Sequence, residues 1–349
     1  MAVIPDDLLD RVWNGSIIHE DVQYLLKIPS FRLFSLADEL CNDVNGDIVT
    51  YVINRNINFT NLCVGTCKFC AFRDDNGYVL SMNEIMNKVE EALDSGATEV
   101  CIQGGLLDGI GISYYCDLLE NIKSSYDIHI HAFSSMEVFH AAKNSNISIK
   151  TALLELKKAG LDSMPGTAAE ILVDDVRKVI CPSKLSSDQW IDVIKTAHQL
   201  GIPTTATMMY GHIETENNRI DHLFKIREIQ KETGGFTEFI PLPFLSKNTS
   251  LEGYCSTNSD DLKIHALARV VFHTHIKNIQ ASWVKLGKKF AQLSLFCGVN
   301  DLGGTLMEEN ISKSAGGAYG ECMMPEEFES IISNVRRIPK RRTTLYQIH

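Results

Sequence analysis

The stretch that decides the fold is YVINRNINFTNLCVGTCKFCAFR, residues 51–73. Its first part, 51–58, alternates between apolar and polar residues as a strand does. Three cysteines follow, Cys63, Cys67 and Cys70, in the loop directly after this strand. In parallel barrels, the loops that follow the strands carry the active site. The stretch therefore predicts a first strand that delivers three thiols to a reaction site.

The three thiols are typical ligands for zinc or for iron–sulfur clusters. A structural zinc site needs four protein ligands, and no fourth cysteine or histidine lies near this loop in the sequence. A 4Fe-4S cluster held by three cysteines leaves one iron open for a small molecule, and we prefer this interpretation. A catalytic zinc and a chance grouping of thiols remain alternatives. Phe69 would either pack in the core or shield the cluster and a bound adenine.

Beyond this loop, predicted strands and helices alternate up to about residue 275. The strands are expected at 51–58, 98–103, 127–133, 161–164, 202–208 and 236–241. Six strand–helix units of this kind imply a parallel sheet with right-handed crossovers, and thus an α/β fold with a partial (βα)6 TIM-type barrel. The predicted domains are an N-terminal helical cap at 1–48, the barrel at 49–275 and a C-terminal extension over the barrel mouth at 276–349.

The composition supports a globular protein and restricts its partners. The 349 residues carry a formal net charge of −11, and 44% of them are hydrophobic. The acidic balance argues against nucleic acid and against a membrane surface as partners. Because we find neither a signal peptide nor an apolar span, we expect a cytoplasmic protein. The seven cysteines outside the loop are then expected to be reduced and mostly buried in the core.

The pattern Cys-x-x-x-Cys-x-aromatic-Cys after the first strand of a parallel barrel resembles the radical S-adenosylmethionine (SAM) enzymes. More closely, NINFTNLCVGTCKFCAFR, DVRKVICP and FIPLPF are similar to the FO synthase subunit 2 family, and the resemblance spans about residues 50–320. The same subfamily contains the two radical enzymes of the futalosine menaquinone route. GGLLDG at 104–109 and HAFSSME at 131–137 depart from the family pattern, which leaves some loop and substrate contacts open.

The resemblance implies a radical SAM barrel with a 4Fe-4S cluster on the three cysteines and SAM bound to the open iron. An electron from a low-potential donor would split SAM into methionine and a 5′-deoxyadenosyl radical. The implied transferase joins the 4-hydroxybenzyl unit of L-tyrosine to 5-amino-6-(D-ribitylamino)uracil, and a partner radical SAM subunit completes the precursor of coenzyme F(420). The alternatives are cyclic dehypoxanthine futalosine synthase or aminofutalosine synthase and, in another class, a non-catalytic iron–sulfur or zinc module.

Five residues at the expected barrel mouth are candidates for binding SAM. Gln103, Gly104 and Gly105 end the second strand, and the two glycines would let the backbone approach the SAM amino group. Glu170 and Arg177 lie seven residues apart, which would place them on one helix face. Glu170 would accept the ribose hydroxyls, and Arg177 would pair with the SAM carboxylate.

The fifth strand and the third strand supply further candidates. Thr207, Met208 and Tyr210 would line the adenine pocket, with core packing as the alternative for the methionines. His129 and His131 lie two residues apart and would share one strand face, where they could bind substrate or move protons.

The last candidates follow the fifth strand and lie in the extension. His212 is a third possible catalytic histidine. Asp301, Glu308, Glu309 and Asn310 are polar residues that would hold a uracil or an amino acid if they faced inward. An acidic surface turn is the competing interpretation of this group.

Overall fold

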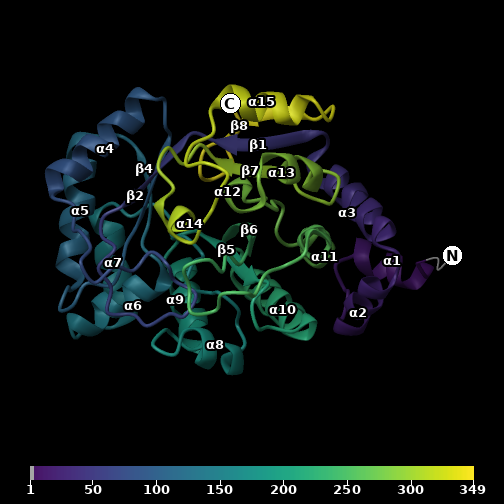
Figure 1. Ribbon diagram of the computed structural model, residues 1–349, viewed down its shortest axis with the longest axis horizontal. Coiled ribbons are helices and arrows are strands. Elements are labelled where there is room, and N and C mark those ends of the chain that lie inside the picture. The colour runs from purple at the N-terminus through teal and green to yellow at the C-terminus, as the bar shows by residue number, and fades with distance from the viewer. Residues whose placement is uncertain (1–3) are drawn as a thin grey trace.

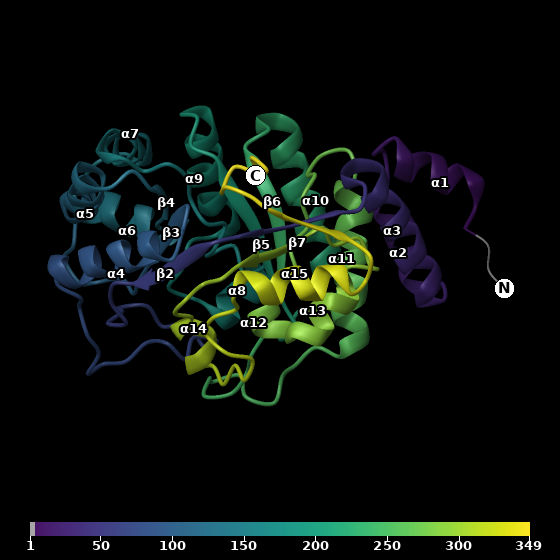
Figure 2. The same ribbon diagram turned by 90° about the horizontal axis from the view of Figure 1, so that it is seen from above.

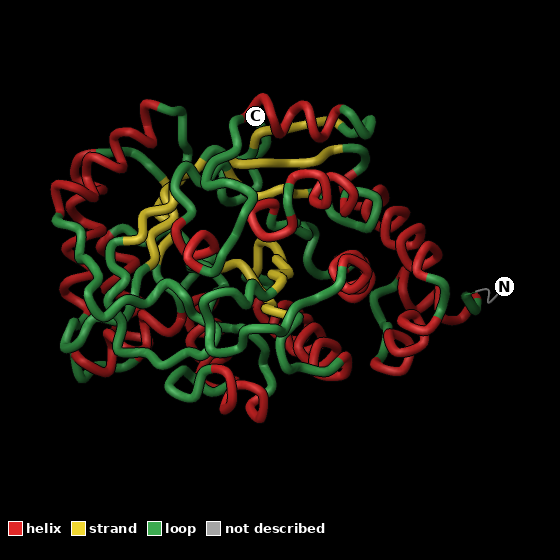
Figure 3. Tube along the Cα trace, viewed as in Figure 1, coloured by secondary structure: helices red, strands yellow, loops and turns green. Residues whose placement is uncertain are grey.

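The computed structural model describes residues 4–349, with parallel strands on the inside and helices around them (Figures 1 and 3). The strands are β1 Ile48–Val52, β2 Asn54–Asn58, β3 Glu99–Gln103, β4 His129–Ala132, β5 Thr204–Tyr210, β6 Phe236–Pro243, β7 Asp301–Gly304 and β8 Ile338–Arg341. The helices are α1 Asp6–Trp13, α2 His19–Lys27, α3 Ser30–Asn45, α4 Met82–Asp94, α5 Ile112–Ser125, α6 Ser135–Asn144, α7 Ile149–Ala159, α8 Asp174–Ile180, α9 Ser187–Gln199, α10 Glu216–Thr233, α11 Asn258–Phe272, α12 Trp283–Leu286, α13 Lys288–Ser294, α14 Asn310–Ser314 and α15 Pro325–Ser333.

Parallel pairing closes the strands into a ring. β2 pairs with β3, β3 with β4, β5 with β6, and β7 with β1, which leads directly into β2. Isolated parallel bridges connect the remaining neighbours: His131 to Ser163, Met164 to Thr204, Phe239 to Ile279, and Gln280 to Asp301. The predicted α/β barrel and its six units are present. In addition, 279–280 and β7, which we assigned to the extension, fill the gap between β6 and β1, since an open arc would leave two strand edges unpaired.

The start of α4, predicted at Ser81, follows from local capping. Ser81 precedes α4, and its hydroxyl oxygen accepts the N–H of Glu84 at 3.3 Å. The Glu84 carboxylate in turn accepts the N–H of Ser81 at 2.7 Å. This reciprocal pair is the capping box expected from the Ser-x-x-Glu spacing.

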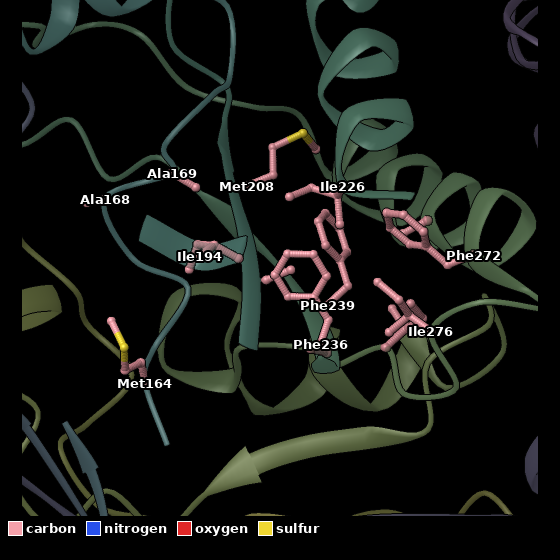
Figure 4. Packing of buried hydrophobic residues seen from close by; sticks show 14 of the residues in the cluster. Met164, Ala168, Ala169, Ile194, Met208, Ile226, Phe236, Phe239, Phe272 and Ile276 are labelled. Atoms are coloured by element: carbon pink, nitrogen blue, oxygen red, sulfur yellow. The ribbon is translucent and has the colours of Figure 1, made fainter. Parts of the chain in front are cut away.

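The main core lies between the strands and the surrounding helices. Figure 4 shows Met208 of β5 and Phe239 of β6 packed against Ile226 of α10 and Phe272 of α11. All four side chains are fully buried. Each contributes roughly 1.5–3 kcal/mol through removal of apolar surface from water. The N-terminal helices α1–α3 extend this packing on the side of α11 (Figure 1).

Residues 276–349 occupy three places rather than one. The bridge at 279–280 and β7 belong to the ring, whereas α14 lies at the barrel mouth. The C-terminal residues 338–349 lie on the other side of the barrel (Figure 2), where β8 pairs in parallel with β1. Within residues 4–349, no helix is both long and apolar enough to cross a membrane.

Candidate active site

A cavity of about 430 Å³ runs through the interior of the barrel. At the mouth it is lined by all three cysteines of the loop after β2. At its inner end it reaches Glu99, the first residue of β3, and Arg342, which follows β8. Its volume is within the usual range for small-molecule sites.

The cysteine loop presents its sulfur atoms to this cavity. The Cys63 sulfur accepts backbone N–H bonds from Gly65 and Leu106, both at 3.3 Å. A Cβ built on Gly65 would lie 3.2 Å from the Cys63 sulfur and 4.0 Å from the Cys67 sulfur, so both thiols face this glycine. Within residues 4–349, no three cysteine, histidine or carboxylate side chains converge at the distance that a single metal ion needs. Three thiols at one cavity, one of which accepts N–H bonds at its sulfur, fit the ligand set of an iron–sulfur cluster.

Gly104 and Gly105 line the cavity, and their missing side chains make room for the cysteine loop. A Cβ on Gly105 would lie 2.0 Å from the carbonyl oxygen of Leu62, and one on Gly104 would lie 2.6 Å from the Phe59 ring. The Gly105 N–H also donates to the carbonyl of Thr60 at 2.9 Å. The two glycines therefore hold the start of the cysteine loop against the end of β3. Their predicted contact with the SAM amino group stays a prediction.

Glu137 is a cavity residue that the sequence interpretation missed. Its carboxylate accepts the Gly104 N–H at 3.0 Å and both the N–H and the hydroxyl of Ser134, at 2.6 and 2.7 Å. Burial raises the pKa of Glu137 to about 7, although these donors act in the opposite direction. The Ser-x-x-Glu box in HAFSSME was the available signal, because it places the acid on the first turn of α6, next to a strand end. Gln103, a predicted SAM contact, also lines this part of the cavity.

Glu170 lines the cavity, but Arg177 does not. The predicted shared helix face is wrong, because α8 begins only at Asp174 and Glu170 lies on the preceding loop with a φ of 46°. Arg177 is buried, and its Nε donates to the main-chain carbonyl of Leu185 at 3.0 Å. Its guanidinium thus holds the 168–185 segment together.

Lys184 places a positive charge in the cavity, where we had expected that of Arg177. Its Nζ lies 2.5 Å from Oε1 of Glu170 and 5.1 Å from the centre of the Phe69 ring. Burial alone would lower the pKa of Lys184, but the charges of Glu170 and Cys67 outweigh it and raise the pKa, so the ammonium stays charged. Phe69, Lys184 and Glu170 all line the cavity beside the cysteine loop.

The residues of β5 that line the cavity differ in part from those that we predicted. Thr207 and Met209 line it, whereas Met208 and Tyr210 do not. Met208 packs in the core on the helix side, and the Tyr210 hydroxyl donates to Asp261 at 2.9 Å. Side chains alternate along a strand, so the assignment of Met208 and Tyr210 to the adenine pocket is wrong by one residue of register.

Of the three predicted catalytic histidines, only His131 lines the cavity. The Nε2 atom of His129 and the Nδ1 atom of His131 both lie 2.7 Å from the Ser163 hydroxyl. Burial lowers the pKa of His131 to about 4, so its ring is neutral at pH 7. His212 is buried outside the cavity, with Nε2 3.1 Å from the carbonyl oxygen of Met209.

The predicted substrate residues Asp301, Glu308 and Asn310 do not line the cavity. Asp301 is fully buried and accepts two bonds from Arg342, at 2.5 and 3.0 Å. Glu308 pairs with Lys88 at 2.5 Å, and Asn310 donates to Glu308 at 3.3 Å. These polar side chains are therefore occupied by neighbours outside the cavity.

Other residues of the extension do line the cavity, and Glu309 and Lys285 are two charged ones among them. Glu309, the remaining candidate of the polar group, accepts a bond from Asn56 Nδ2 at 2.5 Å. Lys285 was missed, although WVKLG was a recognisable string. Among residues 4–349, its Nζ makes no hydrogen bond or ion pair with another side chain. Burial lowers the pKa of Lys285, although Glu309 and Glu170 act in the opposite direction.

Comparison with known sequences identifies the family of this chain. The profile of the radical SAM superfamily matches residues 57–226, and that of the CofH/MqnC C-terminal region matches residues 233–349. A 5-amino-6-(D-ribitylamino)uracil--L-tyrosine 4-hydroxyphenyl transferase of Methanosarcina acetivorans is 58% identical over 99% of this chain and 94% of its own. The enzyme of that name from Archaeoglobus fulgidus is 58% identical over 93% of this chain and 95% of its own.

Solved structures share the fold at low sequence identity. Methylornithine synthase (PylB) superposes with a TM-score of 0.74 at 19% identity, covering 96% of this chain and 97% of its own. The FeFe-hydrogenase maturase HydG from Carboxydothermus hydrogenoformans gives a TM-score of 0.74 at 14% identity, covering 97% and 80%. With the near full-length relatives, these findings establish that the chain belongs to the radical SAM superfamily and, within it, to the family of 5-amino-6-(D-ribitylamino)uracil--L-tyrosine 4-hydroxyphenyl transferases.

Proposed function

We propose that this chain is a radical SAM transferase that joins the 4-hydroxybenzyl unit of L-tyrosine to 5-amino-6-(D-ribitylamino)uracil. The observation that carries the proposal is that the three thiols of the family motif line the same cavity as a set of oppositely charged groups. Relatives that carry this activity in their names are 58% identical over almost the whole chain.

The cysteine loop would hold the cofactor. Cys63, Cys67 and Cys70 would ligate a 4Fe-4S cluster, which supplies the electron that cleaves bound SAM. Burial raises the pKa of the Cys67 thiol to about 12, so this sulfur needs bound metal to be a thiolate at pH 7. Neighbouring groups match the polar parts of SAM: Glu137 and Glu170 offer carboxylates to its ammonium and ribose hydroxyls, and Lys184 offers an ammonium to its carboxylate.

Lys285 and Glu309 would position the amino acid. Both line the cavity, and each opposes the charge of one end of a zwitterion. Held in this way, tyrosine would lose a hydrogen atom to the deoxyadenosyl radical, and its Cα–Cβ bond would break so that the amino-acid backbone leaves as an imine. The hydroxybenzyl unit would join the uracil, and the adduct radical would then give up one electron, which balances the electron used to cleave SAM. The buried walls exclude water and other hydrogen donors from this step. A low-potential electron donor and a partner radical SAM subunit that completes the deazaflavin are also part of the proposal, as is a reducing cytoplasmic setting.

An anaerobic assay tests the assignment. Reconstituted protein, reductant, SAM, tyrosine and 5-amino-6-(D-ribitylamino)uracil should yield 5′-deoxyadenosine together with a tyrosine–uracil adduct of the expected mass. Cys70→Ser is the matched inactive control. Formation of 5′-deoxyadenosine without any adduct would show that the substrate assignment is wrong. Turnover of dehypoxanthine futalosine in place of the uracil would assign the chain to the menaquinone route.

A further inference from the structure

The inner end of the cavity is polar, although parallel barrels are usually filled there by branched apolar side chains. We call this region the inner chamber and define it by six residues that line the cavity: Glu99, His131, Glu238, Gln280, Arg342 and Thr344. Glu99 begins β3, and Gln280 bridges to the first residue of β7, so the inner chamber lies at the amino-terminal ends of the strands. The barrel mouth with its cysteine loop lies at the carboxyl ends.

The C-terminal segment forms the floor of the inner chamber. Arg342 is buried and pairs with Asp301, and the Thr344 hydroxyl donates to Glu99 at 2.5 Å. The Tyr346 hydroxyl donates to the Glu238 carboxylate. Figure 2 shows this segment on the side of the barrel opposite α14. These pairings fix the floor in place, so the polar lining belongs to a closed end of the cavity.

Some polar groups of the inner chamber have no partner in the protein. Within residues 4–349, neither the side-chain amide of Gln280 nor the Nε2 atom of His131 makes a hydrogen bond. Gln280 is held against the backbone of Gly303, where an added Cβ would lie 2.5 Å from the amide nitrogen. Polar groups that face a cavity without a partner are costly unless water or a ligand binds them. The inner chamber is therefore equipped with a positioned donor and acceptor for a guest.

The charges of the inner chamber favour some chemical groups of the two substrates over others. Glu99, Glu238 and Asp301 surround a single guanidinium, that of Arg342, so a ligand carboxylate would be repelled. Hydroxyl groups suit this lining, since they donate to carboxylates and accept from an amide. Tyrosine carries one hydroxyl and two charged groups, whereas the ribityl chain of the uracil substrate is neutral and carries several hydroxyls.

We propose that the inner chamber binds the ribityl chain of 5-amino-6-(D-ribitylamino)uracil, with the uracil ring directed toward the cysteine loop. This inference rests on the proposed function and adds the orientation of the second substrate. It assigns Gln280 as a specificity residue for the polyol. The amino acid then occupies the mouth, where Lys285 and Glu309 provide the charges that a zwitterion needs.

The test compares two uracils that differ only in this chain. Wild-type holoenzyme is assayed with 5-amino-6-(D-ribitylamino)uracil and with 5-amino-6-(methylamino)uracil, each at saturating SAM and tyrosine. The wild type should use the methylamino compound with a KM at least about tenfold higher, because several hydrogen bonds are lost. Gln280→Leu should raise the KM for the ribityl substrate about tenfold and leave the KM for the methylamino compound and for tyrosine within about twofold. Gln292→Leu, which removes an amide bound to Ile331 outside the cavity, should change none of these values.

Each outcome decides the matter. Equal KM values for the two uracils in the wild type would overturn the inference without any variant, even if Gln280→Leu failed to fold. A higher KM for tyrosine in Gln280→Leu, with the ribityl preference retained, would also overturn it and place the phenol in the inner chamber. If the wild type forms no adduct with either uracil while 5′-deoxyadenosine accumulates, the proposed function itself fails.

Discussion

The mouth and the floor of the barrel are both buried and polar, but they use their polar groups differently. At the floor, the charged groups are paired with protein neighbours: Arg342 with Asp301, and Glu99 with Thr344. At the mouth, Lys285 makes no hydrogen bond or ion pair with another side chain among residues 4–349, and the three thiols line open space. Buried polar side chains gather in both places, so such a group of side chains does not by itself identify a reaction site.

Pairing separates the two regions. A polar group with a protein partner contributes to the fold, and its loss leaves the partner buried and unsatisfied. A polar group that faces a cavity alone costs stability and is retained for a ligand. Changes at the mouth should therefore reduce catalysis more than stability, and changes to the paired charges of the floor should do the reverse.

The largest effect is expected at the cysteine loop. Cys67→Ala should abolish cluster binding, seen as loss of the visible absorbance of the reconstituted protein, and should lower 5′-deoxyadenosine formation by more than about a thousandfold, since no electron reaches SAM. The midpoint of chemical unfolding of the metal-free protein should change little, because this sulfur has no hydrogen-bond donor in the fold. Cys322→Ala, an exposed thiol elsewhere, is the control that should retain the cluster. A brown, active Cys67→Ala protein would contradict the assignment.

The floor should show the opposite pattern. Arg342→Met leaves Asp301 buried without its cation and should lower the free energy of unfolding by about 3–5 kcal/mol, measured by urea denaturation. Arg341→Met is the matched control, because the Arg341 side chain is 52% exposed and its pairing contributes at most about 1 kcal/mol. Equal losses in the two variants would show that the buried pair at the floor is not a structural element.

Much of this arrangement could be predicted from the sequence because it is local. The cysteine loop follows its strand directly, and the Ser81–Glu84 box marks the start of α4 within four residues. The register of β5 could not be predicted, because all seven of its residues are buried and its sequence shows no alternation. The placement of Met208 and Tyr210 in the cavity was wrong for this reason.

Residues brought in by distant segments were harder to predict. Lys184 reaches Glu170 from beyond α8, and Lys285 reaches the mouth from beyond β6, so no spacing rule links either lysine to the cysteine loop. The closure of the ring by 279–280 and β7 was not predicted for the same reason. These contacts depend on tertiary packing, and a periodic pattern in one segment carries no information about them.

Gly105 connects the fold to the mouth and should give an intermediate effect. Gly105→Ala would place a Cβ 2.0 Å from the Leu62 carbonyl, so the start of the cysteine loop must move. A displacement of this kind near reacting atoms costs on the order of a hundredfold in rate. The measurements are iron content and 5′-deoxyadenosine formation. Gly96→Ala is the control. A Cβ on Gly96 would meet no atom within 4 Å, but the positive φ of Gly96 disfavours alanine, so this variant should lose stability alone. Unchanged iron content and rate in Gly105→Ala would contradict the role of this glycine.

The smallest effect concerns pH, and two capping boxes provide the comparison. Glu84 and Glu137 both cap a helix through a serine three residues earlier, but Glu84 is exposed and its pKa is lowered by Ser81. Burial at the mouth raises the pKa of Glu137 to about 7. If the charged form of Glu137 binds the SAM ammonium, the rate of 5′-deoxyadenosine formation should rise about tenfold from pH 6 to pH 8.

Replacing each acid by its amide tests whether that ionisation belongs to the mouth. Glu137→Gln should remove the inflection near pH 7, whereas Glu84→Gln should keep it, since of these two carboxyls only that of Glu137 has its pKa raised to about 7. The stability should follow the opposite sign: a raised pKa means that the folded protein holds the proton more tightly, so wild-type stability should fall as pH rises from about 4.5 through 7. Glu137→Gln should make this slope shallower in urea denaturation, and Glu238, whose pKa burial also raises to about 7, should contribute the rest. An inflection that survives in Glu137→Gln would assign the titration to another group, such as Glu238 at the floor, and would weaken the distinction between the mouth and the floor.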